Sequence, residues 1–182
     1  MTTLTSKPST GQIAATETLN AEIHSLHHNT TLQTLVQHAP QHVLLLNTKR
    51  QIVYANATYL AMAEAAGLNG SYGQLLGDYI GCMHAKHTAG SCGTRPACGN
   101  CGALNAIHKS LNGAVAMQRC AIPIDGKDDP LYLVTLTIPV QITGSIYILT
   151  VFVDDNTIIE HPHTLAEHAF AVQKLAGRLQ AA

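Results

Sequence analysis

The chain has 182 residues, of which 46% are hydrophobic and 12% are charged, and its formal net charge is −1. This length and composition predict one globular domain with a sizeable core rather than a disordered chain. Because there is no basic excess, we expect neither nucleic acid nor an anionic membrane surface as a partner. The start, MTTLTSKPSTGQ, has no basic segment followed by an apolar run. We therefore expect no secretion signal and a cytoplasmic, reducing location.

The N-terminal region is predicted to be a disordered segment followed by one helix. Residues 1–12 are rich in Thr and Ser, and we expect them to be disordered. Residues 13–39 are expected to form the N-terminal helix, because apolar side chains recur there at spacings of four and three. These side chains are Leu19, Ile23 and Leu26.

Residues 40–155 are predicted to form the main domain, which begins with a hairpin and a helix. Short apolar runs at 42–47 and 52–56 flank a polar turn, a pattern typical of a β-hairpin. The following residues, 57–66, are rich in Ala, Leu and Met, and favour a helix that ends at Gly67.

The second half of the main domain predicts a helix and three strands. In residues 102–113, Leu104 and Ile107 fall on one helical face, and Asn112-Gly113 supplies the stop. Strand-like runs follow at residues 114–124, 131–142 and 145–154.

Residues 131–153 carry no charge and are long enough to span a bilayer. Pro139, Gln141 and Gly144 interrupt the middle of this stretch, where a membrane helix should be most apolar. β-Branched residues are frequent in both halves. We therefore interpret the stretch as two buried strands joined by a tight turn, and expect no association with a membrane.

Residues 156–182 are predicted to hold a C-terminal helix, from about Thr164 to Gln180. Its apolar residues follow spacings of four, three, four and three: Leu165, Ala169, Val172, Ala176 and Leu179. With the N-terminal stripe, this heptad-like seam predicts a homodimer formed through the terminal helices. We interpret His168 as a surface histidine rather than a phosphoacceptor.

The order of these elements resembles the PAS sensor fold. The run LLLNTKRQIVYANATYLAMA is similar to the first hairpin and following helix of PAS domains. Asn56 matches the asparagine that such domains commonly carry after the second strand. The resemblance implies an α+β fold. We expect a five-stranded antiparallel sheet with helices on one face, flanked by the N- and C-terminal helices.

The cysteines carry a second resemblance. GCMHA, SCGT and CGNCGALNAI, followed by Cys120, resemble a cysteine-rich subgroup of PAS domains that stand ahead of histidine kinases. This resemblance implies a sensor in signal transduction of the two-component type. Its partner would be a histidine kinase or another signalling protein. Too few residues follow the last strand for an ATP-binding module, so we do not expect kinase activity or any other enzymatic activity.

The candidate metal ligands are the four cysteines of the loop at residues 81–107: Cys82, Cys92, Cys98 and Cys101. The Cys-x2-Cys pair lets two thiolates converge on one centre, and Gly99 and Gly102 are expected to permit the turn. A soft set of four thiolates suits zinc or an iron–sulfur cluster. Because only one pair is closely spaced, the pattern favours iron–sulfur over zinc.

Other residues near this loop are alternative ligands. Cys120 lies on a predicted strand, where a free cysteine is usually a small core residue. It is otherwise a fourth ligand in place of Cys82, or a resolving thiol. His84 is an alternative ligand, whereas a lone histidine such as His87 or His108 is more often a solvated or core residue.

Several functions therefore stay open. An iron–sulfur sensor would respond to oxygen, nitric oxide or redox state, whereas zinc would staple a domain that binds a protein or a small apolar ligand. A metal-free thiol redox switch and an enzyme with a reactive thiol are further alternatives. Clustered thiols favour shared ligation over one activated nucleophile, so no catalytic residue is assigned. A c-type haem needs Cys-x-x-Cys-His and is excluded by Gly102.

Overall fold

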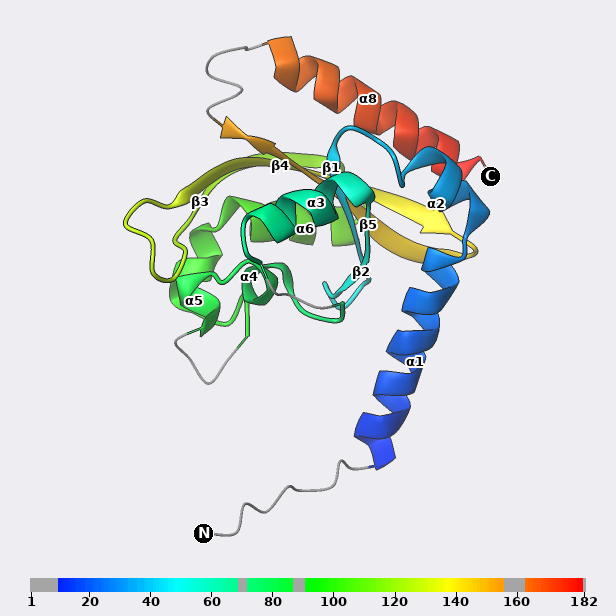
Figure 1. The fold of residues 1–182 in the computed structure, drawn as a ribbon, viewed down its shortest axis with the longest axis horizontal. Helices are drawn as coiled ribbons and strands as arrows, with labels where there is room; N and C mark the ends of the chain where they lie inside the picture. The colour runs from blue at the N-terminus through cyan, green and yellow to red at the C-terminus, as the bar shows by residue number, and fades with distance from the viewer. Residues whose placement is uncertain (1–9, 69–71, 87–90, 156–162, 182) are drawn as a thin grey trace.

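A five-stranded antiparallel sheet forms the centre of the molecule, in the strand order β2-β1-β5-β4-β3 (Figure 1). The computed structural model describes residues 10–68, 72–86, 91–155 and 163–181. The strands are β1 (His42–Leu46), β2 (Ile52–Ala55), β3 (Ala116–Ile122), β4 (Leu131–Ile142) and β5 (Ser145–Asp154). The predicted α+β, PAS-like architecture is confirmed.

Helices cover both faces of this sheet. Figure 1 shows α8 on one side of the sheet and α3, α4, α5 and α6 on the other. The helices are α1 (Thr10–His27), α2 (Thr30–Leu35), α3 (Ala57–Ala65), α4 (Leu76–Tyr79), α5 (Met83–Lys86), the 3-10 helix η1 (Pro96–Asn100), α6 (Gly102–Leu111) and α8 (His163–Gln180).

Two hydrophobic cores result, one on each face of the sheet. Successive side chains of a strand point to opposite faces. In β1, Val43 and Leu45 pack in the core that includes α2 and α8, while Leu44 packs in the core that includes α3 and α6. Burial on both faces explains why β1 is a continuous apolar run rather than an alternating one.

The uncharged stretch at residues 131–153 is the β4–β5 hairpin, as predicted. Ile142 pairs with Ser145 across a two-residue turn. Thr143 and Gly144 in this turn have φ values of 48° and 83°, as a type I′ hairpin turn requires. Among the described residues, no helix combines the length and the apolar character needed to cross a membrane.

The N-terminal helix expected over residues 13–39 is instead two helices. α1 ends at His27, and the side chain of Asn29 caps α2 by accepting a 3.0 Å hydrogen bond from the backbone N–H of Leu32. A capping asparagine satisfies a helical N–H that would otherwise lack a partner, and so favours a new helix start. Residues 10–12, expected to be disordered, belong to α1, whereas residues 1–9 lie outside the described residues.

The apolar seam of α8 packs inside the chain. Val172, Ala176 and Leu179 are buried in the core that α8 shares with β4 and α2. The side chain of Leu165 lies outside the described residues, and Phe170 is 69% exposed. The predicted homodimer would therefore have to use the outer face of the terminal helices.

Asn56 connects three parts of the fold through five hydrogen bonds. It is fully buried, and its Oδ1 accepts from the backbone N–H groups of Val43 in β1 and Tyr59 in α3, both at 3.0 Å. Its Nδ2 donates to carbonyls of the segment between α2 and β1, those of Val36, Ala39 and Gln41, at 3.3, 3.1 and 2.9 Å. The side chain thereby fixes the start of α3 against the sheet and the N-terminal segment.

Replacing Asn56 by Ala should lower the free energy of unfolding by about 3 kcal/mol, because several buried donors and acceptors lose their partners. Urea denaturation monitored by circular dichroism measures the loss. Asn29→Ala is the matched control, since it removes one partly buried cap bond and should cost about 1 kcal/mol. Equal losses in the two variants would contradict the connecting role of Asn56.

Candidate metal centre

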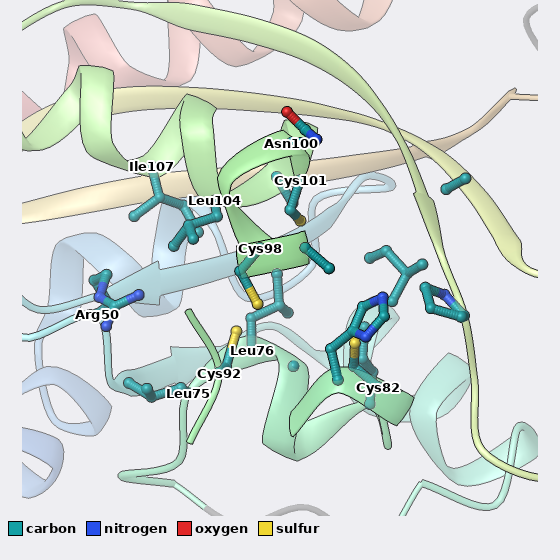
Figure 2. Close-up of a pocket in the computed structure, with 18 residues that line it drawn as sticks. Arg50, Leu75, Leu76, Cys82, Cys92, Cys98, Asn100, Cys101, Leu104 and Ile107 are labelled. Atoms are coloured by element: carbon teal, nitrogen blue, oxygen red, sulfur yellow. The ribbon is translucent and has the colours of Figure 1, made fainter. Parts of the chain in front are cut away.

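Four of the five cysteines line one cavity of about 210 Å³ on the α6 side of the sheet. They are the four predicted ligands: Cys82, Cys92, Cys98 and Cys101. Figure 2 shows Cys92 and Cys98 pointing toward one another, with Cys82 and Cys101 lying farther apart around the same space. The folded chain thus brings together thiols that are separated by up to nineteen positions in the sequence.

Cys98 and Cys101 are held by η1 and the start of α6. The N–H of Cys101 donates to the carbonyl of Cys98 at 3.1 Å. The two glycines of this segment do not play the predicted role, because neither has the positive φ that favours glycine in a turn. Gly99 has open space beside it, whereas a Cβ on Gly102 would overlap the carbonyl oxygen of Arg119 in β3. Gly102 is therefore required for close packing of α6 on β3.

Cys82 and Cys92 are placed by contacts with α4 and with the residues after β3. The N–H of Cys82 donates to the carbonyl of Gly77 at 2.8 Å, and Cys82 forms an isolated bridge with Ile124. The N–H of Cys92 donates to Asp78 Oδ2 at 3.3 Å. A Cβ on Gly77 would lie 2.7 Å from Cys92 Sγ, so a glycine at this position gives the thiol its room.

The thiols of Cys92 and Cys82 are weaker acids in the folded protein than a free cysteine is. Burial raises the pKa of Cys92 to about 11. The backbone N–H of Gly77 opposes this shift, while Asp78 and the thiols of Cys101 and Cys82 add to it. Burial also raises the pKa of Cys82. Since the thiolate is the nucleophilic form, neither Cys92 nor Cys82 has the activated character of a catalytic cysteine.

A single zinc ion and an iron–sulfur cluster make different demands on the positions of the thiols. Within the described ranges, no group of three or more His, Cys, Asp or Glu side chains lies close enough to hold one metal ion. Zinc requires thiolates at about 2.3 Å from a single point. An iron–sulfur cluster is a larger body that is held by thiolates around it.

The alternative ligands fall in different places. Cys120 is buried in the α6-side core, with its Sγ 3.6 Å from Thr135 Oγ1, and does not line the cavity. His84 in α5 does line the cavity. His108 is exposed near the end of α6 and does not line it, and His87 lies outside the described residues.

Three other contributors were missed from the sequence: Arg50, Gly77 and Asp78. Arg50, from the turn between β1 and β2, also lines the cavity. A guanidinium there would offset the negative charge of thiolate ligands. Because these residues lie outside the cysteine segment, no local pattern assigns them to it. The one available signal was the glycine-rich stretch that ends at Gly77.

No protein-family model matches the chain, and no curated protein matches it in sequence. Among solved structures, the chain is similar to the PAS domain of BvgS from Bordetella pertussis, with 14% sequence identity and a TM-score of 0.44. The similarity covers 77% of this chain and 99% of the BvgS domain. The chain is also similar to the PAS domain of an HTR-like protein from Haloarcula marismortui, with 10% identity, 80% and 99% covered, and a TM-score of 0.40. The PAS-like assignment of the fold rests on the sheet itself, and the cysteine-rich subgroup stays a prediction.

Gly102→Ala should destabilise the protein by about 3 kcal/mol, because the new Cβ would force α6 away from β3. Gly99→Ala is the matched control, since open space surrounds that position, and should change stability by less than about 0.5 kcal/mol. Urea denaturation compares the two variants. A Gly102→Ala protein as stable as the Gly99→Ala protein would show that the close approach is not required.

Proposed function

We propose that the chain is a non-enzymatic sensory module whose cysteine cavity holds an iron–sulfur cluster. The proposal rests on one observation, namely that one cavity is lined by Cys82, Cys92, Cys98 and Cys101. When bound, such a cluster would supply sensitivity to redox state, oxygen or nitric oxide. The chain would pass the change to a separate histidine kinase or other signalling protein.

Polar groups around the cavity support this ligand set. Backbone groups of His84 and Ala85 oppose the rise that burial causes in the pKa of Cys82, and the backbone of Gly77 does the same for Cys92. Such polar surroundings favour the thiolate form that metal ligation requires. Arg50 adds a positive charge at the cavity. All five cysteines are free thiols, which agrees with the reducing cytoplasm that we propose as the location.

The position of Cys101 connects ligation to the rest of the fold. Cys101 immediately precedes α6, and α6 packs on β3 and β4. A change in what Cys101 binds would bias the position of the α6 N-terminus, and with it the sheet that α6 covers. The homodimer and the docked kinase both belong to this proposal, with the outer face of the terminal helices as the contact surface.

Purification of the full chain without oxygen tests the cofactor. We expect a brown protein with charge-transfer absorption, and iron and sulfide in stoichiometric amounts. A colourless protein with stoichiometric zinc would show that the site is a structural zinc site and not a cluster site. A metal-free protein with one rapidly alkylated cysteine would instead indicate a thiol switch or a thiol enzyme.

Cysteine variants test the ligand set. Cys98→Ser and Cys101→Ser should each abolish cofactor binding, measured as iron per chain after anaerobic reconstitution. Cys120→Ser is the matched control and should retain most of the iron, because Cys120 does not line the cavity and Thr135 can pair with the new hydroxyl. Loss of iron in Cys120→Ser but not in Cys82→Ser would show that the ligand set is wrong.

Gly77→Ala tests whether room beside Cys92 is needed for binding. The added methyl group should displace the Cys92 sulfur and weaken cofactor binding by about 10-fold or more, as loss of a supporting residue does in other metal sites. A chelator competition after anaerobic reconstitution measures the affinity, with Gly99→Ala as the control. If Gly77→Ala binds the cofactor as tightly as the original protein, Cys92 is not a ligand.

A further inference from the structure

Two histidines at the end of α1 lie against each other on the surface. His24 is in the last turn of α1, and His28 follows the last residue of this helix, His27. This i, i+4 spacing places two side chains on one helical face. The ring centroids of His24 and His28 are 4.1 Å apart, and the ring planes differ by 22°. Both residues are exposed, so that the pair can be reached from solvent.

One hydrogen bond determines which nitrogen of His28 is free. Its Nδ1 lies 2.8 Å from the backbone carbonyl oxygen of His24. Because a carbonyl oxygen only accepts hydrogen bonds, Nδ1 carries the hydrogen, and Nε2 of the neutral ring keeps its lone pair. Metal-binding histidines are typically held in this way, with one nitrogen bonded to a carbonyl or carboxylate group and the other nitrogen on the metal. The ring of His28 is thus oriented as a ligand through Nε2.

The separation of the two rings suits one shared ion. Zinc–nitrogen bonds are about 2.1 Å long, so two nitrogens on the same ion are at most about 4.2 Å apart. Rings with centroids 4.1 Å apart can place one nitrogen each within this span by small rotations. Two histidines at i and i+4 on one face of a helix are a known arrangement for binding zinc.

The surrounding charge also favours a cation at this place. The last carbonyl groups of a helix carry a partial negative charge, which stabilises a cation near the C-terminal end. α1 ends at His27, directly beside the pair. Residues 10–38 contain two Glu and neither Lys nor Arg, so no fixed positive charge within this part of the sequence opposes an ion.

We propose that His24 and His28 form a second metal site, which binds one divalent ion such as zinc or nickel through two imidazole nitrogens. In the part of the chain that the structure describes, no third His, Cys, Asp or Glu side chain completes a ligand set, so water would fill the remaining positions. Imidazole suits zinc, copper and nickel, whereas calcium and magnesium prefer oxygen ligands. The site goes beyond the cysteine-bound cofactor and does not depend on it.

An ion at this site would lock the joint between α1 and α2. His28 directly precedes Asn29, whose side chain caps α2, and the carbonyl of His27 accepts a 2.8 Å hydrogen bond from Gln33 Nε2 in α2. Both histidines must keep their helical spacing to share the ion, so an ion that binds the folded turn opposes its fraying. The ion would thereby hold the path by which the N-terminal helix enters the domain.

A zinc titration of the full chain, kept reduced and followed by NMR, tests the site. The ring resonances of His24 and His28 should shift together, at free zinc concentrations about 10-fold or more below those that shift His108, because the second imidazole raises the effective concentration. His108 is the matched control, since it is exposed in the last turn of α6 and has no histidine four positions away. A pair that responds no earlier than His108 would overturn the proposal.

Single variants distinguish a shared ion from binding to one ring. In His24→Gln and in His28→Gln, the histidine that remains should need about 10-fold or more zinc than in the original protein. His108→Gln should leave the response of the pair unchanged. If either His24→Gln or His28→Gln keeps the original affinity at the remaining ring, the two histidines do not share an ion and the proposal is wrong.

Amide hydrogen exchange tests whether the ion locks the helix end. The backbone N–H of His28 donates to the carbonyl of His24 at 3.1 Å, so its exchange reports opening of this turn. With free zinc at ten times the dissociation constant of the pair, this exchange should slow by about 10-fold. No slowing is expected in His24→Gln. Zinc binding at the two rings with unchanged exchange of this amide would overturn the lock.

Discussion

The five hydrogen bonds of Asn56 are the constraint on which the arrangement of both cores depends. The residue stands where the chain leaves β2 and enters α3, and its amide also holds the segment that leads from α2 into β1. α2 belongs to one face of the sheet and α3 to the other. A short, fully buried amide can make these bonds at low cost because its donors and its acceptor are all paired. The bond to the N–H of Tyr59 also fixes the start of α3.

The cysteine cavity depends on two close approaches in which glycine is the required residue. Gly102 lets α6 touch β3, which sets the position of Cys101, and Gly77 leaves space for the sulfur of Cys92. The thiols thus come from separate segments whose spacing is determined by packing. The cavity therefore lies between elements and not within a single metal-binding turn. The same packing keeps Cys120 close to α6 but in the core.

Strong local patterns were sufficient to predict most of the fold. The strands, α3 and α6 lie close to where apolar runs, helical spacing and stop signals place them, because local propensity and burial agree there. The break at Asn29 was missed because the apolar stripe continues past it, and only the cap reveals a new helix start. The four cavity cysteines are near one another in sequence and were found, whereas Arg50 and Gly77 depend on contacts that no local pattern records. The role of Gly102 was misread for the same reason.

A continuous series of contacts connects the cysteine cavity to the far side of the sheet. α6 begins after Cys101 and is bonded to β4 at Thr137, whose hydroxyl donates to the carbonyl of Ala106 at 3.0 Å and accepts from Ser110 Oγ at 2.8 Å. The flanking residues of β4 point the other way, and Leu136 and Ile138 pack in the core that holds α8. A displacement of α6 would therefore reach α8 through one strand, because Leu136 and Ile138 share a core with the buried seam of α8. Because that seam is already occupied, a partner that senses the displacement would have to contact the outer face of α8, where Phe170 is exposed.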